Sequence, residues 1–271
     1  CFAVKANNNY RILSEIGRLG LGADVVSRGE LIVALKSKIH PKKIVFSGVG
    51  KTYDEIEFAA RKKIFLINAE SQSEIETISK VAKKIKRSID IGIRLNPNVD
   101  AKTIKEITTG KYSNKFGLIE KDVFKLINQF KNSKYLNIKC LSVHIGSQIL
   151  DHKPYEKMLK ILQKVIYKTK FKFEFIDLGG GMGIDYERNN KILNFKKYAS
   201  SIKKFLKKNN CKIIFEPGRS IVGNSAILIT KIVYIKEGFK KDFVILDAAM
   251  NDLMRPALYG AKHKIIPLKK I

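Results

Sequence analysis

The sequence predicts an α/β protein, a (β/α)8 TIM-type barrel followed by the start of a β-rich C-terminal domain. Over residues 1–217, short apolar runs alternate with longer amphipathic segments, giving eight candidate strands separated by seven candidate helices. Beyond that point the alternation stops, and apolar runs follow one another without a long helical pattern between them. We therefore expect a barrel over residues 1–217 and a partial β domain over residues 218–271.

The predicted strands are short apolar runs, as parallel strands buried on both faces usually are. They cover residues 2–4, 22–26, 43–46, 64–68, 89–95, 138–144, 173–178 and 212–215. The predicted helices place apolar residues on one face at helical spacing. They cover residues 10–19, 29–36, 54–61, 71–86, 120–130, 155–167 and 195–208. Beyond the barrel, residues 221–235 and 243–246 are expected as strands.

The charge is strongly positive, with 53 lysines and arginines against 25 acidic residues and a net charge of +28. Such a balance is typical either of a polyanion-binding protein or of a solvated lysine-rich surface. Lysines occur in nearly every predicted helix and turn, with no basic arm, zinc-finger spacing or RNA-binding signature. We therefore interpret the charge as a solvated surface and expect no nucleic-acid partner.

Cysteine use and hydropathy favour a reducing compartment. Cys1, Cys140 and Cys211 are too few and too scattered for a disulfide framework or a zinc site. No signal peptide is visible, and the longest apolar stretch, residues 225–235, is far shorter than a membrane span. We expect a cytoplasmic protein without a membrane partner.

Reactive residue types collect at the carboxyl ends of the predicted strands, where active sites of such barrels lie. Lys5 follows the first strand, so we expect partial burial to disfavour its ammonium form and to leave a Schiff-base nucleophile. The other candidates at this rim are Ser27, Arg94, Asn96, His144, Ser147, Gly179, Gly180, Gly181, Glu216, Gly218 and Arg219.

A glycine-rich turn, Asp-Leu-Gly-Gly-Gly-Met-Gly, begins at Asp177 directly after a predicted strand. Without side chains, its backbone N–H groups can approach an anion such as a phosphate closely. A tight strand-to-helix turn is the simpler alternative. No acidic strand end follows about 20 residues later, which argues against nicotinamide dinucleotide binding.

Gly146 and Ser147 lie two and three residues after His144, where they open the strand end and favour a site over a packed core histidine. The remaining histidines, His40, His152 and His263, show no metal-ligand spacing, so we assign no metal.

Glu216 closes an apolar strand, which is costly for a carboxylate unless it is paired. It therefore either forms a structural salt bridge or faces a cationic cofactor nitrogen, with Gly218 and Arg219 holding an anion beside it.

Taken in order, these motifs resemble the pyridoxal-phosphate-dependent barrel decarboxylases that share the alanine racemase fold. Within that family the bacterial diaminopimelate decarboxylases are the most similar. The resemblance runs almost end to end. Its motifs are FAVKAN (2–7), DVVSRGEL (24–31), FSGVGK (46–51), RLNPNVD (94–100), NKFG (114–117), HIGSQ (144–148), DLGGG (177–181), EPGRS (216–220) and MNDLMRPALY (250–259).

The resemblance implies roles for individual residues. The catalytic residues would be Lys5, which binds pyridoxal 5'-phosphate covalently, His144, which stacks on its ring, and Glu216, which pairs with its pyridine nitrogen. The phosphate would lie among Ser147, Gly180, Gly181, Gly218 and Arg219. The substrate would contact Arg219, Arg255 and Tyr259, since a guanidinium holds a carboxylate by two parallel hydrogen bonds.

The implied reaction removes the carboxylate at the D-centre of meso-2,6-diaminopimelate and yields L-lysine and CO2, the last step of lysine biosynthesis. Family members also have residues before the lysine strand, and a downstream segment that completes the site across a homodimer interface. Because the chain starts at Cys1 inside an apolar run, we expect a fragment lacking both ends. We also expect its final strands, 221–235 and 243–246, to have few partners.

Three alternatives stay open at this point. A relative acting on ornithine, arginine or carboxynorspermidine is the nearest, although residues 250–259 favour diaminopimelate. Alanine racemase is disfavoured, because that enzyme places an arginine rather than a carboxylate such as Glu216 at the ring nitrogen. A non-catalytic barrel that only binds the cofactor would have no need of Arg255 and Tyr259.

Overall fold

The computed structural model describes all residues except 102, 104–106, 188–190 and 269–271. Its main sheet has eight strands, each parallel to the next and ordered as in the sequence. The strands are β1 (Phe2–Ala3), β2 (Ala23–Val25), β3 (Ile44–Phe46), β4 (Leu66–Ala69), β5 (Ile89–Leu95), β6 (Leu136–Val143), β7 (Phe175–Asp177) and β8 (Lys212–Ile214). All eight fall within the ranges predicted from the sequence or within two residues of them.

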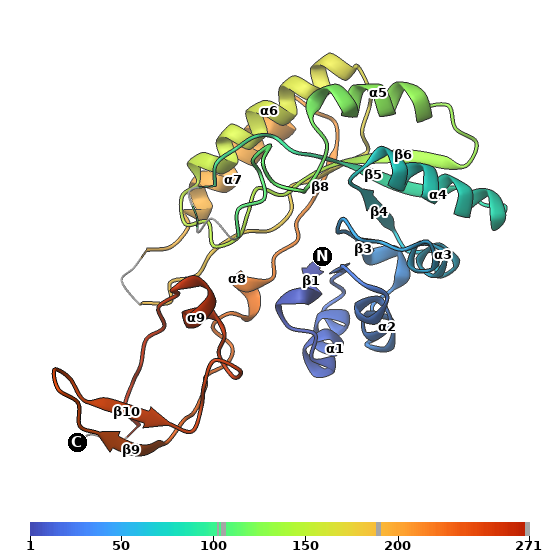
Figure 1. Cartoon of the computed structure of the whole chain (residues 1–271). Helices are drawn as coiled ribbons and strands as arrows, with labels where there is room; N and C mark the ends of the chain where they lie inside the picture. Colours follow the sequence, from blue (N-terminus) through green and yellow to red (C-terminus); the bar gives the residue numbers. More distant parts are fainter. Residues whose placement is uncertain (102, 104–106, 188–190, 269–271) are drawn as a thin grey trace.

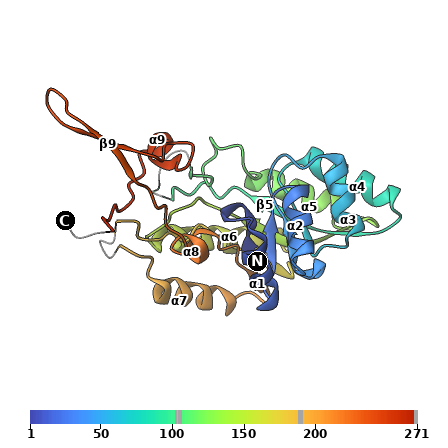
Figure 2. The ribbon, with the colours of Figure 1, turned by 90° about the horizontal axis from the view of Figure 1, so that it is seen from below.

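The two edges of this sheet meet. The amino group of Cys1 donates to the carbonyl of Phe215 (2.8 Å), and the N–H of Ala3 donates to the carbonyl of Pro217 (3.0 Å). The segment after β8 therefore lies beside β1, and the helices lie around the outside of the sheet (Figures 1 and 2). The predicted TIM-type barrel is confirmed.

In the part of the chain that the structure describes, seven α-helices connect the barrel strands, and local capping explains where most of them begin. Side chains of Asn9, Ser27, Thr52, Ser71 and Asn194 accept hydrogen bonds from the first turns of their helices. The helices are α1 (Tyr10–Arg18), α2 (Arg28–Lys36), α3 (Tyr53–Arg61), α4 (Gln72–Lys84), α5 (Glu120–Phe130), α6 (Lys153–Thr169) and α7 (Phe195–Leu206). Short 3-10 turns follow β1 (η1, Val4–Ala6) and precede β3 (η2, Pro41–Lys43).

The barrel core is apolar with a small polar centre. Every residue of β2, β3 and β4 is buried, as expected of strands packed on both faces. Gly92 in β5 makes room for the Asn68 side chain, because a Cβ there would lie 2.1 Å from Asn68 Oδ1. A polar side chain thus lies inside the barrel, where it can hold a functional group.

The C-terminal part differs from the prediction. Residues 221–235 do not form one strand, because α8 (Arg219–Val222) comes first and only Ile232–Lys236 (β9) is extended and paired. β9 pairs antiparallel with β10 (Phe243–Leu246), so the two strands have each other as partners. A short helix, α9 (Arg255–Tyr259), was not predicted. The division after residue 217 stays a prediction.

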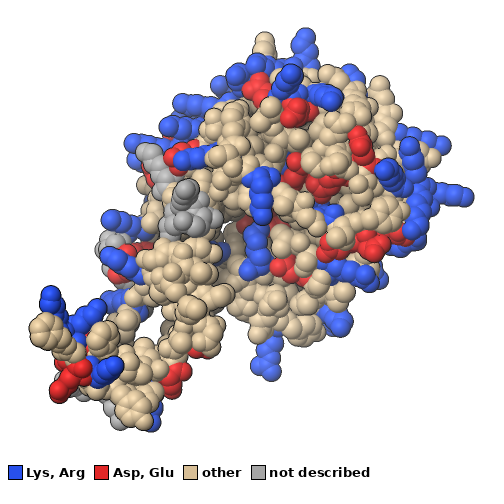
Figure 3. Space-filling model, viewed as in Figure 1, with Lys and Arg blue, Asp and Glu red and all other residues tan. Residues whose placement is uncertain are grey.

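Both strands of this hairpin are exposed along their whole length, and the hairpin projects from the barrel in Figure 1. On the face shown in Figure 3, lysines and arginines are scattered over the barrel and the C-terminal part, with acidic side chains among them. Within the described residues, no helix combines the length and the apolar character needed to cross a membrane.

Candidate active site

Lys5 lies in η1, immediately after β1, and its side chain is 51% exposed. Its Nζ donates to Asp24 Oδ2 at 3.1 Å, and Asp24, in β2, is fully buried. The Asp24 carboxylate raises the pKa of Lys5 and outweighs the opposite effect of burial. The sequence-based expectation of a disfavoured ammonium was therefore wrong: Asp24 holds the amine in its charged form.

The sequence analysis did not single out Asp24, although it lies in a quoted motif. Its second oxygen, Oδ1, is buried and has no hydrogen-bond partner among the described residues. A buried carboxylate with an unpaired oxygen is costly, so the lysine is its main compensation. The signal that could have identified it is an aspartate inside an otherwise apolar strand.

Glu216 and Asp177 form a buried acidic pair. Ser47 Oγ donates to Glu216 Oε1 at 3.4 Å, and Glu216 is only 8% exposed. Burial raises the pKa of Glu216 well above its usual range, and the nearby negative charge of Asp177 raises it further. The interaction with Asp177 thus favours the protonated form of Glu216.

Three hydrogen-bond donors hold the Asp177 carboxylate in place. Its Oδ2 accepts from Asn68 Nδ2 (2.9 Å) and Ser142 Oγ (3.2 Å), and its Oδ1 accepts from the Gly179 N–H (2.9 Å). Burial raises the pKa of Asp177, while these hydrogen bonds favour its ionised form. The three donors therefore favour leaving the shared proton on Glu216.

His144 follows β6 and is fixed by the glycine-rich turn. The N–H of Gly180 donates to His144 Nδ1 at 3.2 Å, and Thr109 Oγ1 donates to the His144 carbonyl at 2.9 Å. Burial lowers the pKa of His144 well below its usual range, and the charges of Arg94 and Lys5 lower it further. Because Nδ1 accepts, the neutral ring carries its proton on Nε2.

The backbone conformation and close packing after β7 require glycines. Gly179 and Gly181 have φ values of +63° and +90°, which residues with a Cβ rarely adopt. At Gly180 an added Cβ would lie 2.1 Å from the carbonyl oxygen of Glu216. The turn therefore packs directly on the segment that carries Glu216.

Ser147 and Arg219 come together beside this turn. Arg219 donates through Nε and Nη2 to Ser147 Oγ, each at 3.3 Å. The N–H groups of Gly181, Gly218 and Arg219 have no carbonyl acceptor among the described residues. A guanidinium, a hydroxyl and free N–H groups form a donor set that suits a phosphate.

Arg255 and Arg219 lie on the same tyrosine. The guanidinium carbons of Arg255 and Arg219 lie 4.4 Å and 5.7 Å from the centre of the Tyr186 ring. Tyr259 is 37% exposed and lies one turn after Arg255 in α9, so the two side chains are on the same face of that helix. Two predicted substrate residues, far apart in the sequence, are thus brought together by a residue that the sequence analysis missed.

The remaining rim candidates have structural contacts. Ser27 Oγ accepts from the N–H of Glu30 and caps α2. Asn96 donates through Nδ2 to two backbone carbonyls of the following loop (2.8 and 2.9 Å). Arg94 forms a buried ion pair with Glu70, 2.7 Å apart. These residues support the rim, and Arg94 adds positive charge near His144.

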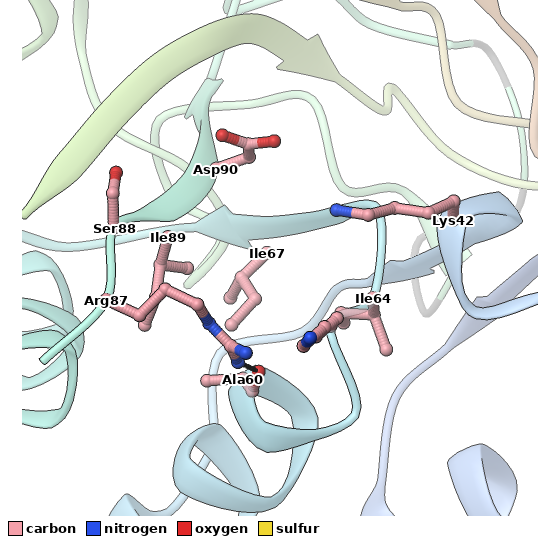
Figure 4. Close-up of a pocket in the computed structure, with 9 residues that line it drawn as sticks. Lys42, Ala60, Ile64, Ile67, Arg87, Ser88, Ile89 and Asp90 are labelled. Carbon is pink, nitrogen blue, oxygen red and sulfur yellow. Dashed lines mark hydrogen bonds between the residues drawn. The ribbon is translucent and has the colours of Figure 1, made fainter. Parts of the chain in front are cut away.

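The pocket in Figure 4 lies at the opposite end of the barrel. It has a volume of about 160 Å³ and is lined by Lys42, Ala60, Lys63, Ile64, Ile67, Arg87, Ser88, Ile89 and Asp90. Most of these residues lie at or before the amino ends of β4 and β5, whereas the candidate site lies at the carboxyl ends. The pocket is therefore not part of the candidate site.

The donor set at the carboxyl ends fits pyridoxal phosphate. A half-exposed lysine amine can bind its aldehyde, and Glu216, whose raised pKa favours a protonated carboxyl group, can serve its ring nitrogen. Ser147, Arg219 and the free N–H groups suit its phosphate. Fold and site together define a pyridoxal-phosphate-dependent barrel.

Comparison with known proteins agrees with this class. The model of the pyridoxal-dependent decarboxylase family, pyridoxal binding domain, matches residues 1–223. The chain therefore belongs to the pyridoxal-dependent decarboxylase family, and pyridoxal phosphate is its cofactor.

Proteins similar to this chain include diaminopimelate decarboxylases. The chain is 42% identical to diaminopimelate decarboxylase of Aquifex aeolicus over 99% of its length and 65% of that protein. It is 46% identical to the enzyme of the same name from Helicobacter pylori J99 over 98% of its length and 66% of that protein. The crystal structure of the Helicobacter pylori enzyme complexed with L-lysine has a TM-score of 0.91 and 44% identity, covering 97% of this chain and 67% of that chain. This chain thus spans about two thirds of the length of these relatives.

Proposed function

We propose that the protein decarboxylates meso-2,6-diaminopimelate to L-lysine and CO2, the last step of lysine biosynthesis. The observation that carries this proposal is the pairing of Arg219 and Arg255 around Tyr186, next to the predicted phosphate site. Among the described residues neither guanidinium has a carboxylate partner, so both can bind carboxylates of a substrate. The names of the similar enzymes support the same reaction.

Pyridoxal phosphate, when bound, accepts the electron pair left on the substrate carbon as the carboxyl group leaves. Lys5 provides the covalent anchor, and Asp24 keeps its amine at the rim. The raised pKa of Glu216 favours a proton on its carboxyl group. Passing that proton to the ring nitrogen would leave a carboxylate to pair with the resulting cation. Asp177 limits where that proton can go, because its other lone pairs are occupied by Asn68 and the glycine turn.

The neutral ring of His144 would lie against the cofactor. A neutral imidazole adds no charge there, so the positive charge beside Glu216 stays on the ring nitrogen. Ser147, Gly180, Gly181, Gly218 and Arg219 would surround the phosphate. Arg219, Arg255 and Tyr259 would contact the substrate.

The domain and assembly assignments belong to the same proposal. Residues 1–217 would form the pyridoxal-phosphate-binding barrel and residues 218–271 part of a β domain. The protein would act in the cytoplasm as a homodimer whose subunits share the active site. The hairpin strands expose apolar side chains, which is typical of a surface that another protein segment covers.

The test is lysine formation by the complete protein with added cofactor. We expect CO2 and L-lysine from meso-diaminopimelate, and little product from ornithine, arginine or carboxynorspermidine. A preference for one of those three substrates would assign the protein to the neighbouring decarboxylases. Cofactor binding without CO2 release from any of the four would favour a non-catalytic barrel.

A further inference from the structure

Four side chains from three parts of the chain form one cluster, which we call the arginine clamp: Tyr186, Arg219, Arg255 and His263. Tyr186 belongs to the loop between β7 and α7, Arg219 begins α8, Arg255 begins α9, and His263 lies beyond α9. Arg219 Nη1 donates to the Tyr186 hydroxyl. The cluster therefore joins the barrel to the C-terminal part beside the candidate site.

His263 acts as a hydrogen-bond acceptor for Arg255 in this cluster. Its Nε2 lies 3.0 Å from Arg255 Nη1. A guanidinium only donates, so Nε2 must accept and the ring must be neutral, with its proton on Nδ1. The ring of His263 also meets the Tyr186 ring edge to face, with centres 4.9 Å apart. Arg255 is thus held from one side by a hydrogen bond and from another by a ring face.

Holding two arginines together requires such supports. Burial lowers the pKa of Arg255, and the positive charge of Arg219 lowers it further because the two guanidinium groups repel each other. The electron-rich face of Tyr186 offsets part of this repulsion, since both guanidinium groups lie near that ring. No carboxylate of the described residues is within ion-pair distance of either arginine, so their charges are left for an external anion.

We propose that Tyr186 and His263 are positioning residues that hold Arg219 and Arg255 as a paired recognition site for a ligand with two carboxylates. This inference deepens the proposed function, because it concerns the substrate site of that reaction. His263 acts through Arg255, and Tyr186 acts through both arginines.

Protonation of His263 opens the clamp. The charged ring has no lone pair for Arg255 and repels it, so ligand affinity falls as the pH drops. The ionisable groups that face His263 are Arg255, Arg219 and Tyr186. Burial and the two arginines lower the pKa of His263, so the closed clamp persists at neutral pH.

The test measures binding of pimelate, the seven-carbon dicarboxylate without amino groups, to the complete cofactor-loaded protein by calorimetry. Hexanoate, with one carboxylate, is the control ligand. We expect His263→Ala to weaken pimelate about tenfold and to leave hexanoate nearly unchanged, because a hydrogen bond to a charged group is lost. His263→Gln keeps an acceptor and should restore most of the affinity.

Two further variants sharpen the result. Tyr186→Phe keeps the ring and removes the hydroxyl, so we expect a smaller loss than in Tyr186→Leu, which removes both. His40→Ala is the matched control, because that exposed histidine precedes β3 at the other end of the barrel. Retention of the visible cofactor absorption in each variant shows that the barrel is folded and loaded.

The pH profile separates positioning from simple packing. In the wild-type protein pimelate affinity should fall as the pH is lowered through the titration of His263, and in His263→Gln this fall should be absent. Three results would each overturn the inference. The first is an unchanged pimelate affinity in His263→Ala, and the second is a pH profile in His263→Gln that equals that of the wild-type protein. The third is the absence of pimelate binding by the wild-type protein. Lysine formation tests the proposed function independently, so either can fail while the other holds.

Discussion

Asp24 Oδ2 and Lys5 Nζ lie 3.1 Å apart, and only the lysine reaches solvent. This ion pair places a charged amine where a cofactor aldehyde would have to bind, yet the attack requires the neutral amine. Since Asp24 raises the pKa of Lys5, it both locates the amine and limits its reactivity. The pair therefore controls how readily the cofactor is attached.

Asp24→Asn should speed cofactor attachment at neutral pH. The amide keeps the shape but removes the charge, so the pKa of Lys5 falls and more of the amine is neutral at a given pH. The check is the rate at which visible absorption appears when pyridoxal phosphate is added to cofactor-free protein, measured across pH. We expect the profile to move to lower pH, and an unmoved profile would show that Asp24 does not set the pKa.

Lys5→Ala should abolish that absorption altogether, because no other lysine lies at the carboxyl end of β1. Reduction with borohydride and peptide mapping of the wild-type protein should find the cofactor on Lys5. A label on another lysine, or a retained absorption band in the variant, would contradict the assignment. Lys43→Ala, at the end of η2 directly before β3, is a suitable control that should keep the band.

Glu216→Gln should change thermal stability and catalytic turnover in opposite directions. Burial raises the pKa of Glu216, so the folded cofactor-free protein holds a proton that the unfolded chain releases. The free energy of unfolding therefore falls as the pH rises from the usual glutamate range towards the raised pKa. The amide cannot ionise, so thermal melts of the cofactor-free variant should show a higher melting temperature at neutral pH and a flatter dependence on pH.

The same variant should lose activity once loaded. Without a carboxylate beside the ring nitrogen, turnover should fall by at least roughly 100-fold, the scale of a lost preorganised electrostatic contact, while cofactor absorption remains. Near-normal turnover would make Glu216 a structural residue. A melting temperature below that of the wild-type protein would show that the buried acid pair stabilises the fold instead.

Arg255→Ala should weaken diaminopimelate selectively. A charge-assisted contact with a bound carboxylate is worth about 1.5–3 kcal/mol, so we expect a large rise in KM for this substrate. Ornithine has no distal carboxylate and should be processed no worse by the variant than by the wild-type protein. Equal losses for both substrates would indicate a disturbed site rather than a lost carboxylate contact.

The sequence predicted the barrel because each strand is an apolar run bounded by turns, a local property. It also predicted that Lys5, His144 and Glu216 stand at strand ends, where the structure has them, while their catalytic roles stay predictions. It missed the polar centre. Asn68 donates to Asp177 across 109 positions of the chain, a contact that neither period nor spacing encodes. The burial that raises the pKa of Glu216 is likewise a property of the packed barrel.

The C-terminal part shows a second limit. Residues 221–235 are rich in isoleucine and other strand formers, so the pattern predicts a strand. A strand also needs a partner backbone, and β10 supplies one only for Ile232–Lys236. The arginine clamp was missed for a related reason: Tyr186 and His263 carry no motif, and their role appears only where three parts of the chain converge.

The hairpin itself should be the least protected part of the sheet structure. β9 and β10 pair only with each other in the part of the chain that the structure describes, and all their residues are exposed. An isolated two-stranded hairpin is marginally stable in water, because it buries too little apolar surface to offset the ordering of its backbone.

β5 and β6, by contrast, lie inside the eight-stranded sheet with nearly every residue of β5 buried. In this 271-residue chain, hydrogen exchange followed by mass spectrometry should find the amides of β9 and β10 exchanging about 100-fold faster than those of β5, or more. Equal protection of the two regions would show that the hairpin is covered in solution by a surface of this chain or of a second copy, and dilution would distinguish the two.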